Sequence, residues 1–160
     1  MAKLKIVPSL WYTNDAEAAA KLYVSLFPDS HIDHTWSVPT TTPSGPAGSV
    51  IVIELTLLGQ PFQLMQAGEL DPFNHAISFT VNCETQEEID RYYDGLLADG
   101  GKEENCGWVA DKYGVRWQIV TPLLSELQRD ADKAKAVRVT QAMMKMKRID
   151  IATIRRAAEG

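Results

Sequence analysis

Cysteine and long apolar runs are both scarce in this chain of 160 residues. Cys83 and Cys106 are its two cysteines and form no Cys-x-x-Cys pattern, which argues against a disulfide framework and a cysteine-based zinc site. No apolar run approaches the ~20 residues needed to cross a bilayer, and the first residues lack the apolar core of a signal peptide. We therefore expect reduced thiols, a cytoplasmic location and no membrane partner.

Positive charge is also in short supply. The chain has 16 lysines and arginines against 21 acidic residues, giving a net charge of −5. Nucleic-acid binding requires a basic face, so no nucleic-acid partner is expected. The length and the 45% apolar content are ordinary for one globular domain with a substantial core.

The stretch from Cys106 to Val120 organises the rest of the chain. It is typical of two strands joined by a tight turn at residues 112–114, because Gly114 accepts positive φ without strain. Strand alternation then separates an apolar face from a polar one, with Val115, Trp117 and Ile119 on the first and Arg116, Gln118 and Val120 on the second. The pattern Gly-x-x-aromatic-Gln-aliphatic that begins at Gly114 also begins at Gly59.

The first half of the chain predicts a strand, a helix and three more strands. The strand over 4–13 precedes a helix that is capped by Asn14 or Asp15 and ends near Phe27. Strands follow over 31–38, 49–58 and 61–66, with a loop over 39–48 that is rich in Pro, Gly and Thr and long enough to act as a flap.

The second half predicts the same order of elements. A strand over 75–82 leads to the capping box that starts at Thr85, then to a helix ending near Ala98, a strand over 102–104 and the hairpin. After Pro122 we expect helices over 123–129, 132–146 and 149–158. The prediction is an α+β fold with an internal repeat: a domain over 1–122 built of two β-α-β-β-β modules, about 1–68 and 74–122, and a helical C-terminal extension over 123–160.

The paired modules resemble the vicinal oxygen chelate superfamily, which includes glyoxalase I, bleomycin-resistance proteins and extradiol dioxygenases. Within it the chain is similar to the PhnB-like branch, which carries the description 3-demethylubiquinone-9 3-methyltransferase. The similar segments are Ala16–Tyr23, Ser25–Pro28, Cys106–Trp108, Asp111–Val115 with Trp117-Gln118, and the tail Gln141–Ile151. The resemblance implies a curved mixed sheet around a cavity and a homodimer. Methyl transfer is not expected, because no Gly-rich nucleotide loop opens a helix.

The superfamily places a metal ligand, typically His or Glu, on the first and last strand of each module. Matched to this sequence, the first-strand positions carry Pro8 and Ala76, and the last-strand positions carry Gln63 and Gln118. Pro and Ala cannot ligate through their side chains, and a neutral amide is a weak substitute for a carboxylate. His75 is one residue away, so only a shift of register would make it a ligand. The resemblance therefore implies a site with no metal and no other cofactor.

Strand alternation predicts a concave face with apolar walls and a few polar groups, which is typical of a small-molecule site. Its members are Leu10, Tyr12, Val52, Glu54, Gln63, Met65, Ser78, Thr80, Arg116 and Gln118. The ligand-binding residues we predict are Tyr12, Glu54, Gln63, Ser78, Trp108, Arg116 and Gln118.

Several of these residues have alternative roles. Arg116 and the two glutamines suit a carboxylate or phosphonate, although the glutamines can instead bond to each other. Glu54, the carboxylate predicted on this face, is either a general base or the partner of Arg116. Cys106 is either a nucleophile or a packed thiol, and Trp108 either covers a ligand or belongs to the core.

Two functions follow from these observations. The first is a metal-free binding protein for a small hydrophobic or anionic compound, as in bleomycin resistance. The alternative is an enzyme of the glyoxalase or dioxygenase type, a lyase or isomerase with an altered metal site. Trp36 and the methionine-rich segment of Met143, Met144 and Met146 offer apolar surface for packing and for a homodimer.

Overall fold

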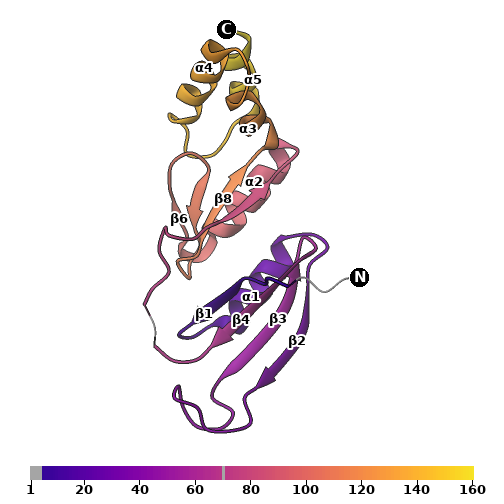
Figure 1. The fold of residues 1–160 in the computed structure, drawn as a ribbon, viewed down its shortest axis with the longest axis vertical. Coiled ribbons are helices and arrows are strands. Elements are labelled where there is room, and N and C mark those ends of the chain that lie inside the picture. Colours follow the sequence, from indigo (N-terminus) through magenta and orange to yellow (C-terminus); the bar gives the residue numbers. More distant parts are fainter. Residues whose placement is uncertain (1–4, 70) are drawn as a thin grey trace. The chain divides into compact units, whose positions relative to one another are not determined.

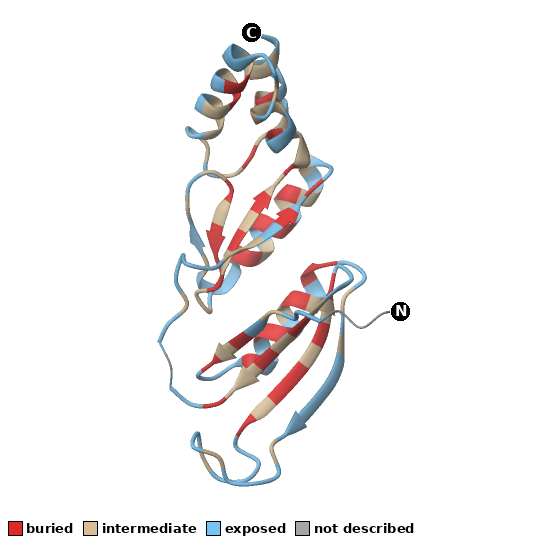
Figure 2. Ribbon diagram, in the orientation of Figure 1, coloured by how far each residue is buried: buried red, intermediate tan, exposed pale blue. Residues whose placement is uncertain are grey.

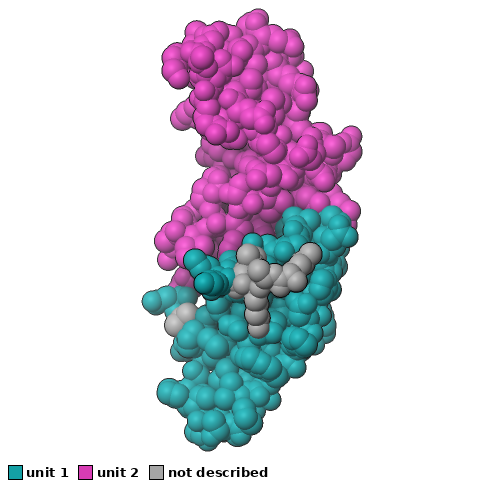
Figure 3. Space-filling model, turned by 45° about the vertical axis from the view of Figure 1, so that its right-hand side comes forward, with its two compact units in different colours: residues 1–71 teal, residues 72–160 magenta. Residues whose placement is uncertain are grey.

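The structure is a computed structural model that describes residues 5–69 and 71–160, and it is an α+β fold (Figure 1). The chain divides into two compact units, residues 1–71 and 72–160, shown in different colours in Figure 3. Unit 2 combines the second module with the C-terminal helices. None of the helices in the described ranges has the length and apolar character to span a membrane.

Unit 1 is one β-α-β-β-β module. Its elements are β1 (Ser9–Tyr12), α1 (Ala16–Leu26), β2 (His31–Ser37), β3 (Ile51–Leu57) and β4 (Gln60–Gln66). The strands form one sheet in the order β1-β4-β3-β2, in which β1 runs parallel to β4 and the other neighbours are antiparallel.

Unit 2 repeats that topology and adds three helices. Its module comprises β5 (Phe79–Asn82), α2 (Gln86–Leu97), a short 3-10 helix (Ala98–Gly100), β6 (Lys102–Glu103), β7 (Trp108–Ala110) and β8 (Arg116–Val120). The sheet order β5-β8-β7-β6, with β5 parallel to β8, reproduces that of unit 1. The extension contains α3 (Pro122–Gln128), α4 (Lys133–Met143) and α5 (Ile151–Glu159). The predicted fold class and the internal repeat are confirmed.

In both modules the helix packs on one face of its sheet and forms the core there, as the buried stretches of Figure 2 show. In unit 1, Ala19 and Tyr23 of α1 are buried with Ile53, Leu55 and Leu64 of the sheet. In unit 2, Ile89, Tyr93 and Leu96 of α2 are buried with Val109, Trp117 and Ile119. Because successive strand residues alternate between faces, Gln63 and Gln118 lie on the opposite face of their sheets, where unit 1 also has an apolar cluster of Val52, Met65 and Trp11.

The two module helices begin differently. Thr85 forms the predicted capping box with Glu88, since its side chain accepts from the Glu88 N–H while the Glu88 carboxylate accepts from the Thr85 N–H. Asp15 stands at the predicted start of α1 but adopts the left-handed conformation, and its side chain makes no capping bond. The position of the α1 cap was therefore predicted, but not its chemistry.

Two predicted strands are shorter than expected. The first begins at Ser9, and its predicted residue Leu4 lies outside the described residues. The Pro8 carbonyl accepts from the Gln63 N–H at 2.9 Å, so proline stands at the strand edge where no donor is needed. The strand predicted from His75 begins only at Phe79, because the Asn74 side chain accepts from the Ala76 N–H and turns the chain.

Asp111 fixes the turn between β7 and β8. Its carboxylate accepts from the N–H groups of Tyr113 and Val115 at 2.9 and 3.0 Å and from the Trp117 indole at 3.0 Å. Asp111 is only 3% exposed, so these bonds replace the water that the charge loses on burial. Gly114 takes a φ of 89°, as the turn requires. The matching turn of unit 1 is the two-residue link Leu58-Gly59.

The extension is bound to the second module through backbone and side-chain contacts. The N–H groups of Cys106 and Gly107 donate to the carbonyls of Met146 and Lys147 at 2.8 and 2.6 Å. A Cβ at Gly107 would lie 2.7 Å from the Ile119 carbonyl oxygen, so only glycine permits this close approach.

Gln86 and Arg148 hold the segment before α5 against α2. The Gln86 amide donates to the Ile149 carbonyl at 3.0 Å and accepts from the Ile151 N–H at 2.9 Å. The Arg148 guanidinium pairs with Asp90 and Asp94 of α2, and it lies 4.7 Å from the centre of the Tyr93 ring. The C-terminal helices are thus an integral part of unit 2.

Candidate functional site

The polar face of the unit 2 sheet lies on the side opposite α2. Val115, Trp117 and Ile119 are buried, whereas Arg116, Gln118 and Val120 are partly exposed, as strand alternation predicts. Gln118 is opposite Trp108 in β7 and Thr80 in β5, and side chains paired in this way share one face. Trp108, Gln118 and Thr80 therefore form a continuous row across three strands.

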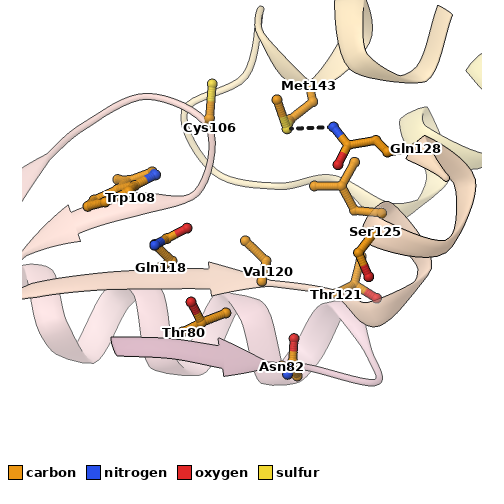
Figure 4. Close-up of a pocket in the computed structure, with 11 residues that line it drawn as sticks. Thr80, Asn82, Cys106, Trp108, Gln118, Val120, Thr121, Ser125, Gln128 and Met143 are labelled. Carbon is orange, nitrogen blue, oxygen red and sulfur yellow. Dashed lines mark hydrogen bonds between the residues drawn. The ribbon is translucent and has the colours of Figure 1, made fainter. Parts of the chain in front are cut away.

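A cavity of about 330 Å³ opens between this row and the C-terminal helices (Figure 4). The strands and the loop before β7 contribute Thr80, Asn82, Cys106, Trp108, Gln118 and Val120 to its lining. The helical side contributes Thr121, Leu124, Ser125, Gln128 and Met143. Volume and lining match a small-molecule site: mostly apolar walls with a few converging polar groups.

Three predicted residues line the cavity or contact its lining directly. Gln118 and Trp108 face it, and Ser78 accepts a hydrogen bond from the Gln118 amide nitrogen at 2.8 Å. This hydrogen bond to Ser78 orients the Gln118 amide. Cys106, predicted as a nucleophile or packed thiol, also lines the cavity and adopts a φ of 60°, an uncommon conformation for a non-glycine residue.

Arg116 lies on the same sheet face but not in the cavity lining. Its Nε donates to Glu104 Oε1 at 3.2 Å, and His75 Nε2 lies 2.9 Å from the other oxygen of the same carboxylate. The His75 ring in turn lies 6.0 Å from the Trp108 ring, centre to centre. Glu104, which sequence reasoning missed, thus supplies Arg116 with a carboxylate partner within unit 2.

Unit 1 carries a related face on its own sheet. The Ser9 hydroxyl donates to Gln63 Oε1 at 3.2 Å, so each module pairs a serine near its first strand with the glutamine of its last strand. Glu54 is opposite Gln63, and His34 is opposite Glu54, which extends the row to the edge strand β2. His34 was not predicted as part of this face, because the register between β2 and β3 is not visible in the sequence.

The prediction for the first strand had the wrong parity. Ser9 and Trp11 are the residues in register with Gln63 and Met65, so Tyr12 lies on the opposite face with Leu10. Tyr12 is 3% exposed, and its hydroxyl is 2.9 Å from that of Tyr23 in α1. The same shift places Ser9, rather than Pro8, beside Gln63. Tyr12 therefore belongs to the core under α1 and not to the polar face.

The two cysteines lie in different environments. Cys83 is fully buried beneath α2, and burial together with the nearby Glu88 carboxylate raises the pKa of its thiol to about 12. Its thiol is protonated at neutral pH and packs as a small apolar group. Cys106 is partly exposed at the cavity. The two residues are unpaired thiols, as expected from the sequence.

The side chains present do not fit the metal site of the superfamily. Among the described residues, no three His, Cys, Asp or Glu side chains gather closely enough to hold a metal ion. In unit 1 the row around Gln63 offers the Glu54 carboxylate and the His34 imidazole, and in unit 2 Gln118 has Thr80 and Trp108 beside it. Divalent transition metals require several imidazole, thiolate or carboxylate ligands, and we derive no step through a metal.

Sequence reasoning also missed the helical wall of the cavity. Leu124, Ser125, Gln128 and Met143 come from the extension, which was predicted as a packing surface. Met143 faces the cavity, whereas the neighbouring Met144 is 66% exposed. Helical periodicity predicts that these two neighbours point in different directions. It does not predict which part of the chain each side chain contacts.

Residues 4–120 match the family model described as 3-demethylubiquinone-9 3-methyltransferase, so α3, α4 and α5 lie beyond the matched region. A PhnB protein from Bacillus cereus with that same description is 35% identical, with a TM-score of 0.64, and the match covers 74% of this chain and 98% of that one. None of the curated proteins matches the chain.

Two more distant solved structures share the fold. Protein PA1353 from Pseudomonas aeruginosa is 21% identical with a TM-score of 0.53, over 74% of this chain and 97% of that one. The fosfomycin resistance protein FosX from Listeria monocytogenes is 16% identical with a TM-score of 0.53, over 79% of this chain and 97% of that one. At these identities the likeness supports the vicinal oxygen chelate fold and no shared activity.

Proposed function

Because this chain belongs to the PhnB-like family described as 3-demethylubiquinone-9 3-methyltransferase, within the vicinal oxygen chelate superfamily, we propose that it is a metal-free small-molecule binding protein. The proposed site is the cavity of unit 2, with Trp108 and Gln118 as its main contacts on the sheet side. Glu54 and Gln63 lie on the sheet face of unit 1 and are not among the residues that line this cavity.

The observation that carries this proposal is the neutral character of the cavity. Its described lining consists of apolar, hydroxyl, amide, thiol and thioether groups, with no Lys, Arg, Asp, Glu or His side chain among them. A neutral site without a counter-charge disfavours an ion, because the ion loses much of its water and gains no charged partner. The ligand is therefore an uncharged and largely apolar molecule, with Trp108 available to stack on a planar ring.

This ligand class replaces the carboxylate or phosphonate that the sequence suggested. That idea depended on Arg116 as an anion-binding group, but the guanidinium is paired with Glu104 and lies outside the cavity lining. The side chains of this pair are only 17% and 23% exposed, so an incoming anion would have to break a partly desolvated ion pair. Arg116 acts in this proposal by holding Glu104 beside His75.

An enzymatic role has weaker support. Cys106 is the nucleophilic side chain in the cavity, but no His, Asp or Glu belongs to the described lining to accept its proton. Methyl transfer gains no support from the site, since the sequence holds no Gly-rich loop opening a helix for a nucleotide-like cofactor. Binding without chemistry is therefore the proposed function.

Two fluorescent probes that differ by one sulfonate test the proposal. We expect neutral N-phenyl-1-naphthylamine to bind at least tenfold more tightly than 1-anilinonaphthalene-8-sulfonate, measured by fluorescence titration. Trp108→Ala should weaken binding of the neutral probe about tenfold, because a large aromatic contact is lost. Trp36→Ala in unit 1, where the ring is 45% exposed, is the matched control and should leave the affinity unchanged. Tighter binding of the sulfonate, or an unaffected Trp108→Ala variant, would disprove the proposal.

We also propose a cytoplasmic homodimer. The supporting observations are the exposed apolar side chains Trp36, Val137 and Met144, which a second copy can cover. Sedimentation velocity of the full chain should give about twice the monomer mass, and a monomer at micromolar concentration would contradict this part of the proposal.

A further inference from the structure

We infer that the C-terminal extension selects the ligand, by presenting the Gln128 carbonyl oxygen to a hydrogen-bond donor at the far end of the bound molecule. This inference rests on the proposed binding function and adds to it the chemical class of the ligand. Its basis is the position of Gln128 in the cavity wall opposite the sheet and the contact of its amide with Met143.

The helical wall is held in place, so it can discriminate between ligands. Backbone bonds join Cys106 and Gly107 to the segment that follows α4, and the pairing of Arg148 with α2 fixes the start of the next helix. The α3 and α4 helices contact each other, and Gln128 of α3 bonds to Thr140 and Met143 of α4. A rigid wall is what allows a hydrogen-bonding group to reject a ligand that lacks the matching donor.

The chemistry of sulfur determines how the Gln128 amide is turned. A thioether sulfur can accept a hydrogen bond but cannot donate one, so the amide nitrogen must face Met143 Sδ, at 3.6 Å. The same nitrogen donates to Thr140 Oγ1 at 3.3 Å, which uses its second proton. Both side-chain hydrogen bonds of Gln128 within the described residues come from its nitrogen, which leaves the carbonyl oxygen as an acceptor, and Figure 4 shows the amide end of Gln128 reaching toward the cavity.

A second acceptor stands on the sheet side. The Gln118 nitrogen is bonded to Ser78, which leaves the carbonyl oxygen of Gln118 as the acceptor on β8 (Figure 4). The cavity thus has an amide carbonyl on each of two walls, with Trp108, Val120 and Leu124 as apolar surface. The matching ligand is a neutral aromatic molecule with a hydroxyl or amino donor at each end.

Two naphthols provide the test, because they share one ring system and differ by one donor. We expect 2,6-dihydroxynaphthalene to bind the wild-type protein about fivefold more tightly than 2-naphthol, the value of one net hydrogen bond of about 1 kcal/mol. In Gln128→Leu this ratio should fall to about one while the affinity for 2-naphthol is retained through Gln118. Fluorescence titration of both compounds measures the ratio.

Met143→Leu tests the mechanism, since leucine fills a similar volume but cannot accept from the amide nitrogen. We expect the ratio to fall toward about two, because the amide loses the bond that orients it. Met144→Leu changes the same residue type at the next position, where the side chain is exposed, and should keep the wild-type ratio. Thermal unfolding of each variant confirms that the fold is retained.

The outcomes separate this inference from the proposal on which it rests. A ratio that stays near fivefold in Gln128→Leu, or that falls equally in Met144→Leu, overturns the selection by Gln128 while binding in the cavity stands. If neither naphthol binds the wild-type protein, or if Trp108→Ala leaves the affinity for 2-naphthol unchanged, the proposed function itself fails.

Discussion

The two modules have the same topology and the same serine–glutamine pair, but they surround that pair with different chemistry. In unit 1 the Gln63 amide lies beside Glu54, with His34 at the next position in the row. In unit 2 the Gln118 amide lies beside Trp108 and Thr80 and faces a cavity closed by the C-terminal helices. The repeat therefore places a glutamine on the last strand of each module, whereas the neighbouring strands and the extension determine which ligand that glutamine can bind.

The same contrast holds for the turns and caps. Unit 2 uses polar side chains at both places: Asp111 organises its last hairpin, and Thr85 caps its helix. Unit 1 uses backbone conformation instead, with a Leu58-Gly59 turn at positive φ and a left-handed Asp15 before α1. Substitution of a single side chain at a turn or cap should thus lower the stability of unit 2 more than that of unit 1.

The largest expected effect is that of Asp111→Ala. The variant loses three hydrogen bonds to a buried carboxylate and leaves the Trp117 indole N–H without its partner, which should lower the free energy of unfolding by about 3 kcal/mol. Hydrogen exchange followed by mass spectrometry locates the loss, because it reports stability segment by segment. We expect faster exchange in β7 and β8 and unchanged protection in β3 and β4.

Asp111→Asn is the matched control for that experiment. The amide keeps one carbonyl acceptor and nearly the same shape, so the loss should be about half as large. Equal losses for the two variants would show that the charge, rather than the hydrogen-bond geometry, holds the turn. If hydrogen exchange became faster to the same extent in both units, Asp111 would not act on the hairpin of unit 2 alone.

The second prediction compares the two glutamines. Gln118→Leu should weaken binding of 2-naphthol about tenfold, or about 1.4 kcal/mol, because the ligand hydroxyl loses its acceptor on the sheet. Gln63→Leu, the same substitution in the other module, should weaken it less than twofold. Isothermal titration calorimetry measures both affinities. Similar losses would mean that the sheet faces of both modules contact the ligand, as the sequence alone suggested for Gln63 and Glu54.

The smallest effect concerns the helix caps. Thr85→Ala removes a side chain that accepts from the Glu88 N–H at 3.2 Å and should cost about 1 kcal/mol of stability. Asp15→Asn should cost about 0.3 kcal/mol or less, since the Asp15 side chain makes no capping bond and asparagine also tolerates the left-handed conformation. Urea denaturation gives both values. A larger loss at Asp15 would show that its left-handed backbone depends on the aspartate side chain.

Local patterns predicted most of the fold. The parity of β8, the capping box at Thr85 and the turn at Gly114 each depend on residues within about five positions, and all were predicted correctly. The order of elements in the two halves also revealed the repeat. These features are visible in the sequence because propensity, period and turn chemistry agree within each short segment.

The errors arose where spacing or distant contacts decide the structure. Strand alternation separates the two faces of the first strand but does not show which face pairs with Gln63, and a shift of one residue reverses them. Ser9 is the residue in register with Gln63, so Tyr12 lies on the other face. The wall formed by Gln128 and Met143 depends on the packing of α3 against α4 and on the bonds that join the segment after α4 to Cys106 and Gly107. No local pattern specifies such contacts, which is why the cavity was predicted on one wall only.

The backbone hydrogen bonds from Cys106 and Gly107 to the segment after α4 have a consequence for biosynthesis. Neither sheet uses the carbonyls of residues 146 and 147, so the strands of both modules pair without any residue beyond β8. The cavity has its second wall only after nearly the whole polypeptide has been translated, because domains fold as their segments become available. A released polypeptide that ended shortly after β8 would contain the strands of both sheets and lack the helical wall of the cavity.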